Sequence, residues 1–142
     1  MAVREILLLG NPGLHEVCTP VLRGELDGLR PAIQDMRDTL LAFRARQGVG
    51  RAIAAPQIGL TRRIVLLERV SNAAKDNTTG IGTPAALINP LLSDLSKETV
   101  ELWDDCFSFP DLLVRVRRHR TCTITYRDLD WVAHTVPLEG DL

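Results

Sequence analysis

One helical stripe followed by a long extended pattern limits the fold of this chain more than any other feature. Within residues 27–47 the apolar positions recur four, three, four and three residues apart, at Leu29, Ile33, Met36, Leu40 and Phe43. This spacing places them on one face of a helix, with Arg37 and Arg44 off that face. The helix is expected to begin at a cap provided by Asp27 and to end at Gly48, with Pro31 tolerated in its first turn.

After residue 62 the pattern becomes that of short strands, rich in branched residues or alternating in polarity. The predicted strands are Arg63–Val70, Ala85–Leu92, Glu98–Trp103, Leu112–Arg117, Thr121–Arg127 and Trp131–Pro137. Turns are expected at 10–13 and 128–130, and the turn formers of 71–84 predict an exposed loop. One helix followed by antiparallel strands is an α+β arrangement, in a single domain over residues 1–142.

Charge and composition exclude several classes of protein. Lys and Arg number 17 against 18 Asp and Glu, so the net charge of −1 lacks the broad basic footprint of nucleic-acid-binding proteins. The basic run 115–120 is therefore interpreted as a solvated hairpin, with nucleic-acid binding as the alternative. No apolar run approaches the ~20 residues of a membrane span, and the start does not resemble a signal peptide. Three irregularly spaced cysteines favour a reducing, cytoplasmic setting over a disulfide framework.

Two segments carry residues suited to chemistry. Gly50–Gln57 is dense in small residues, which allow close approach of a backbone, and Gln57 could donate to a developing oxyanion. The alternative is a packed turn whose glutamine serves nearby backbone. In Asp104–Pro110, the thiolate of Cys106 could bind zinc or iron or act as a nucleophile. The alternative is a small buried thiol.

In this order, the two segments resemble the first two signature motifs of the peptide deformylase family. The first motif has the form G-x-G-x-A-A-x-Q, and Gly50–Gln57 matches it except at Ala52, where the second glycine is expected. The second reads E-G-C-L-S, of which Asp104–Ser108 keeps the cysteine and the serine. Further matches to the family lie at Gly10–Leu14, Met36, Thr39 and Ile88–Pro90.

The resemblance implies removal of the N-formyl group from the initiator methionine of new polypeptides. In the family a divalent metal, Fe²⁺ in many natural enzymes with Zn²⁺ or Ni²⁺ as substitutes, holds the attacking water. Carried over by position, Cys106 is the metal-binding thiolate, and Gln57 stabilises the oxyanion together with the backbone N–H of Phe107. Gly50, Arg51, Ala52 and Ile53 line the groove in which a peptide pairs as an added strand. Arg51 and Ala52 depart from the family's apolar residue and glycine, so an altered specificity is expected.

The family's remaining ligands, two histidines of an H-E-x-x-H helix with its glutamate base, have no match in these 142 residues. The histidines present are His15, His119 and His134, which lack that spacing. The domain is therefore expected to be incomplete at its C-terminal end and inactive as written, with apolar strand faces left exposed. A non-catalytic module that binds peptide N-termini or a protein partner is the alternative. Expected partners are formyl-Met peptide N-termini, with the ribosome and a second copy of the chain as further candidates.

Overall fold

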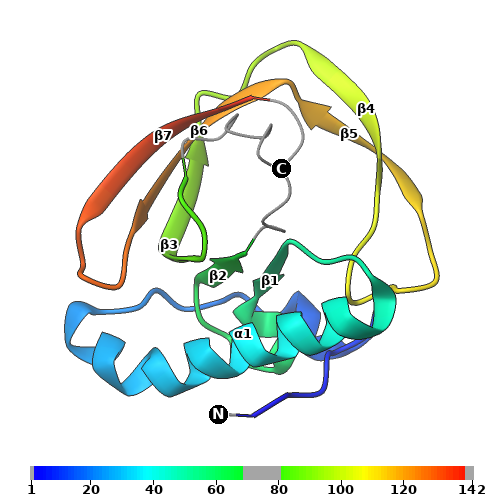
Figure 1. Cartoon of the computed structure of the whole chain (residues 1–142). Helices are drawn as coiled ribbons and strands as arrows, with labels where there is room; N and C mark the ends of the chain where they lie inside the picture. The colour runs from blue at the N-terminus through cyan, green and yellow to red at the C-terminus, as the bar shows by residue number, and fades with distance from the viewer. Residues whose placement is uncertain (1, 69–80, 140–142) are drawn as a thin grey trace.

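The computed structural model describes residues 2–68 and 81–139, and Figure 1 shows their arrangement. Two 3-10 turns, η1 (Pro12–His15) and η2 (Arg23–Glu25), precede the long helix α1 (Leu26–Gln47). The remaining elements are β1 (Ala52–Ala54), η3 (Ala55–Ile58), β2 (Ile64–Leu67), β3 (Ala85–Ser93), β4 (Thr99–Asp104), β5 (Val114–His119), β6 (Thr121–Arg127) and β7 (Ala133–Glu139).

The strands form two separate antiparallel sheets. Five of them pair in the order β1-β2-β3-β6-β7, while β4 and β5 form a two-stranded ribbon. In Figure 1, α1 runs below β1 and β2, and the ribbon stands across from β3, β6 and β7. The predicted α+β class, with one helix and antiparallel strands, is confirmed.

Helix α1 covers one face of the large sheet with the predicted stripe. Ile33, Met36, Leu40 and Phe43 are all buried, together with the sheet residues Ile53, Ile64, Leu66 and Ile88. The alternation of side chains along β2 explains which of its residues contact the helix. Ile64 and Leu66 point to α1, while Val65 and Leu67 point the other way. The burial of this stripe is the main source of stability that the helix contributes.

The opposite face of the sheet carries a second apolar cluster. Its buried members are Leu67, Ile81, Leu87, Ile124, Tyr126 and Leu138, each less than a tenth exposed. The expectation that apolar residues on the uncovered strand faces stay exposed is therefore wrong at these positions, whereas Leu91 and Leu92 of β3 and Trp103 of β4 are more than half exposed. They are buried because side chains from β2, β3, β6 and β7 pack against one another and against Ile81.

The start of α1 differs from the prediction, whereas its end agrees. The helix begins at Leu26, after η2, so Asp27 is not its cap; the Asp27 carboxylate instead accepts from Arg30 Nε at 2.9 Å. Pro31 consequently lies beyond the first turn. At the other end Gly48 adopts φ 74° and its N–H donates to the Arg44 carbonyl, as a helix-terminating glycine does.

The predicted strands are found with shifted ends, except β6, which agrees fully. The final hairpin turn is longer than predicted because one Asp128 carboxylate oxygen accepts from the N–H groups of both Asp130 and Val132. This delays the start of β7 to Ala133. Residues 69–70 of the first predicted strand and 71–80 of the predicted loop lie outside the described residues. Within the described part of the chain, no helix is long and apolar enough to cross a membrane.

Candidate functional site

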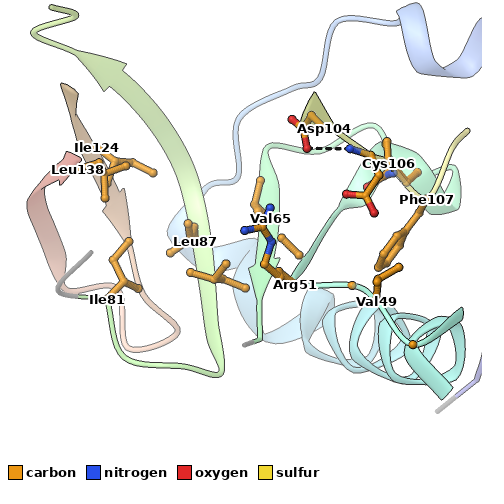
Figure 2. Close-up of a pocket in the computed structure, with 16 residues that line it drawn as sticks. Val49, Arg51, Val65, Ile81, Leu87, Asp104, Cys106, Phe107, Ile124 and Leu138 are labelled. Atoms are coloured by element: carbon orange, nitrogen blue, oxygen red, sulfur yellow. Dashed lines mark hydrogen bonds between the residues drawn. The ribbon is translucent and has the colours of Figure 1, made fainter. Parts of the chain in front are cut away.

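A hollow of about 590 Å³ opens between the second apolar cluster and the segment that follows β4. Figure 2 shows Leu87, Ile124 and Leu138 on one wall, and Cys106 and Phe107 on the other. The floor between them comes from residues 48–52 and from β2. Its volume is within the range of small-molecule and peptide side-chain pockets, and its walls are mostly apolar with a polar rim.

Strand β1 presents an open backbone edge to this hollow. Its register pairs Ala52 with Leu67 and Ile53 with Leu66, and the carbonyl of Arg51 accepts from Glu68 N–H at 2.7 Å. Because hydrogen-bonding direction alternates along an antiparallel strand, the peptide groups of Ala52 point away from β2. Ala52 also lines the hollow. An extended peptide could therefore pair with this edge.

The side chains of Gln57, Cys106 and Ser108 meet at the rim. Gln57 Nε2 lies 3.4 Å from Cys106 Sγ and 3.1 Å from Ser108 Oγ, while its Oε1 accepts from the N–H of Ala54 at 2.9 Å. The N–H of Ser108 points at the same sulfur from 3.5 Å. The Gln57 oxygen thus serves nearby backbone, as the packed-turn interpretation expects, while its amide nitrogen points at the thiol. The role of Gln57 as a donor to an oxyanion stays a prediction.

Phe107 contributes a free backbone donor and a packed ring. Its N–H makes no hydrogen bond within residues 2–68 and 81–139. Its ring stacks on Phe43 of α1 with the centroids 4.0 Å apart. Gly50 lies directly against that ring, because a Cβ placed on Gly50 would come within 2.6 Å of Cζ. Only glycine fits there, and φ 138° at this residue also favours glycine.

Of the charged side chains that the structure describes at the rim, one is already paired and two are not. Asp104 has both carboxylate oxygens occupied, one by the N–H of Asp105 at 2.9 Å and one by Arg118 Nη2 at 2.7 Å. The side chains of Asp105 and Arg51 are exposed and make no hydrogen bond or ion pair within the described residues. The rim thus carries one positive and one negative group that are open to a ligand.

A network of two arginines joins α1 to the floor of the hollow, and sequence reasoning missed it. Arg37 donates to both carboxylate oxygens of Glu68 at 2.7 and 2.9 Å. This hydrogen-bonded pair holds the pKa of the Glu68 carboxyl below its usual value. Arg44 donates through Nε and Nη2 to the Gly50 carbonyl at 3.0 and 2.8 Å, and Nη2 also contacts the Glu68 carbonyl. The sequence contained one indication of this network: Arg37 and Arg44 are seven residues apart, which puts both arginines on one side of the helix.

The metal-binding side chains of the described residues do not fit a hydrolytic metal ion. Within the described residues, no three His, Cys, Asp or Glu side chains are grouped so that they could hold a metal. The histidines are engaged elsewhere or exposed: His119 contacts the Ser96 carbonyl, His134 contacts Asp128, and His15 lies on the surface. Cys106 is thus a single sulfur donor, whereas three protein ligands are usual in catalytic zinc sites.

Comparison with known proteins gives a consistent result. The family model described as polypeptide deformylase matches residues 3–142. A peptide deformylase from Leptospira biflexa is 33% identical over 146 residues, covering 99% of this chain and 76% of that protein. A protein named peptide deformylase-like from Brucella melitensis is 32% identical, also covering 99% of this chain and 76% of its own length.

The solved structures agree with the sequence relatives. The crystal structure of a peptide deformylase from Thermotoga maritima superposes with a TM-score of 0.80 at 26% identity, covering 99% of this chain and 84% of that one. A peptide deformylase from Ehrlichia chaffeensis in complex with actinonin gives a TM-score of 0.79 at 26% identity, covering 99% and 77%.

Proposed function

This chain belongs to the peptide deformylase family, and from that premise we propose that its 142 residues form the substrate-binding part of a site for removing the N-formyl group from the initiator methionine of nascent polypeptides. Peptide deformylases are metal-dependent and act on formyl-Met peptides. Within this activity, the 142 residues supply the substrate side of the site. The observation that carries the proposal is the contact of Gln57 with Cys106 beside the open edge at Ala52, next to a Phe107 N–H that no group within residues 2–68 and 81–139 accepts.

The groove of the proposal is formed by Gly50, Arg51, Ala52 and Ile53, of which Ile53 contributes through its backbone because its side chain is buried. A peptide that pairs with the outward peptide groups of Ala52 brings its N-terminal formyl group toward the rim at Cys106. There the Phe107 N–H and one hydrogen of the Gln57 amide are the donors for the carbonyl oxygen. The Gln57 amide must leave Cys106 or Ser108 to serve in this way.

Cys106 is the metal ligand of the proposal, with Fe²⁺, Zn²⁺ or Ni²⁺ as candidate ions. Within residues 2–68 and 81–139, Cys106 lacks the partner ligands needed to hold such an ion. We propose that the 142 residues, a single domain without the family's H-E-x-x-H pair, bind formyl-Met peptides without hydrolysing them. The alternative, a non-catalytic binding module, is supported by the contacts of Cys106 Sγ, which is approached by the N–H groups of Gln57 Nε2 and Ser108 and belongs to no group of three metal-binding side chains within residues 2–68 and 81–139.

Metal analysis and a formyl-Met-Ala-Ser assay on the same sample test the proposal. We expect metal well below one equivalent and no release of formate, together with measurable binding of the peptide. Stoichiometric metal with turnover would contradict the proposed inactivity. Absence of any binding would contradict the groove.

Partners and location are part of the same proposal. A cytoplasmic setting fits the three cysteines, none of which is paired in a disulfide.

The ribosome, approached through the basic run 115–120, is a weaker candidate as a partner. Three arginines of this run already form ion pairs with acidic residues of the chain: Arg117 with Glu101, Arg118 with Asp104, and Arg120 with Glu98. If charge reversal at Arg117 and Arg118 leaves ribosome co-sedimentation unchanged, binding to the ribosome through this run is ruled out. A homodimer is tested by the sedimentation velocity of the chain.

A further inference from the structure

The loop between α1 and β1 contains two glycines, whose backbone can adopt many conformations. Gly48 and Gly50 both adopt positive φ, at 74° and 138°, which other residues rarely adopt. The loop nevertheless has to bring Gly50 against the Phe107 ring and Ala52 to the open edge of the sheet. Something outside the loop must therefore hold it in place.

Arg44 is the side chain that does so. Its guanidinium occupies the Gly50 carbonyl with two N–H groups, at 3.0 and 2.8 Å, and also contacts the Glu68 carbonyl at the end of β2. The following carbonyl, of Arg51, is held by the Glu68 N–H at 2.7 Å. The two peptide carbonyls directly before β1 are thus fixed, and the peptide groups of Ala52, the first residue of β1, face outward.

We propose that Arg44 is a positioning residue for the peptide groove: by clamping the Gly50 carbonyl it holds Gly50 against the Phe107 ring and sets the Phe107 N–H relative to the open edge at Ala52. This inference rests on the proposed function, because it assumes that a formyl-Met peptide occupies the groove. The fixed geometry lowers the entropy that the loop would otherwise lose on binding.

Arg37 provides a matched control on the same helix. It lies seven residues before Arg44 and ties α1 to the same residue, Glu68 directly after β2, but through the Glu68 carboxylate and without touching Gly50. Loss of either arginine therefore weakens the attachment of α1 to β2. Only the loss of Arg44 releases the loop.

The test compares Arg44→Met, Arg44→Lys and Arg37→Met in the full chain by calorimetric titration with formyl-Met-Ala-Ser. We expect Arg44→Met to weaken binding by about tenfold and Arg44→Lys by less, since a lysine can reach the Gly50 carbonyl with one donor. Arg37→Met should change affinity less than about twofold. Equal losses of affinity in Arg44→Met and Arg37→Met would overturn the inference, because both arginines would then act only by attaching α1 to the sheet.

Hydrogen–deuterium exchange gives a second readout that needs no ligand. In Arg44→Met, exchange should rise in 48–52 and in 105–109 while α1 stays protected; in Arg37→Met both segments should match the wild type. Uniform loosening in both variants would also overturn the inference. If the wild-type chain binds no formyl-Met peptide, the proposed function fails, and the exchange pattern alone decides whether Arg44 fixes the loop.

Discussion

The two faces of the five-stranded sheet are built in different ways. On the helix side, Met36 and Leu40 are fully buried, and Arg37 of α1 pairs with Glu68, directly after β2. On the other side, Leu87 and its neighbours are buried as well, but they border a hollow of about 590 Å³ with a polar rim. Tight packing is thus found on the helix face of the sheet, and the groups able to contact a ligand are on the opposite face. Residues 48–52 join them.

Truncation of one leucine on each face gives the largest expected effect. Leu40→Ala should lower the free energy of unfolding by about 3–5 kcal/mol, because it leaves a closed cavity under α1. Leu87→Ala only enlarges a hollow that already exists, so a loss of about 1–3 kcal/mol is expected. Urea unfolding of both variants measures the difference. Equal losses would show that the hollow side is packed as tightly as the helix side.

A methyl group at the junction of the two faces should have the next largest effect. Gly50→Ala places its Cβ 2.6 Å from the Phe107 ring at a residue with φ 138°, so we expect a loss of about 2–3 kcal/mol. Phe107→Leu removes the clashing ring atoms and should return part of that loss when combined with it. A double-mutant cycle by urea unfolding measures the coupling. Strict additivity would mean that the ring does not constrain Gly50.

The ion pair on the helix side should have a smaller effect that depends on pH. Because Arg37 lowers the pKa of Glu68 in the fold, the pair stabilises the protein above the carboxyl's unfolded pKa, and the contribution is lost as pH falls through the folded pKa. Glu68→Gln should cost about 1 kcal/mol at pH 7, after allowance for solvent screening at half-exposed Arg37. Urea midpoints of the wild type and the variant should draw closer as pH falls below about 4. A difference that stays constant between pH 7 and pH 3 would rule out this origin.

The ribbon of β4 and β5 should show the smallest effect. Arg117 and Glu101 lie 3.2 Å apart with side chains 70% and 49% exposed, so Arg117→Ala is expected to change the free energy of unfolding by less than about 0.5 kcal/mol. Thermal unfolding at low and high salt checks this, and the variant and the wild type should respond alike. A loss above 1 kcal/mol would mean that the ribbon is held by its charges.

Local patterns in the sequence predicted most of the fold. The apolar stripe of α1, the helix-terminating Gly48 and the whole of β6 follow from spacing and turn chemistry, which are local. The start of α1 was missed because Glu25, rather than Asp27, receives a backbone N–H, from Leu22, and extends the turn upstream. The end of the last turn was missed because one Asp128 oxygen accepts two backbone N–H groups.

The candidate site was predicted less completely. The residues Gln57 and Cys106 came from a resemblance to family motifs, and the structure brings their side chains to 3.4 Å. Neither the clamp of Arg44 on Gly50 nor the stacking of Phe107 on Phe43 could be read from the sequence, because each joins residues by contacts that no spacing rule encodes. The roles assigned to these residues stay predictions until they are tested.

Recognition of the formyl group is the most direct test of the central claim. Calorimetric titration should compare formyl-Met-Ala-Ser with Met-Ala-Ser, using the wild-type chain and Gln57→Ala, and the recovered peptide should be examined by mass spectrometry. The account predicts that the formylated peptide binds more tightly, that Gln57→Ala reduces this preference, and that the peptide is recovered with its formyl group. Equal affinity for both peptides, or recovery of the deformylated product, would contradict it.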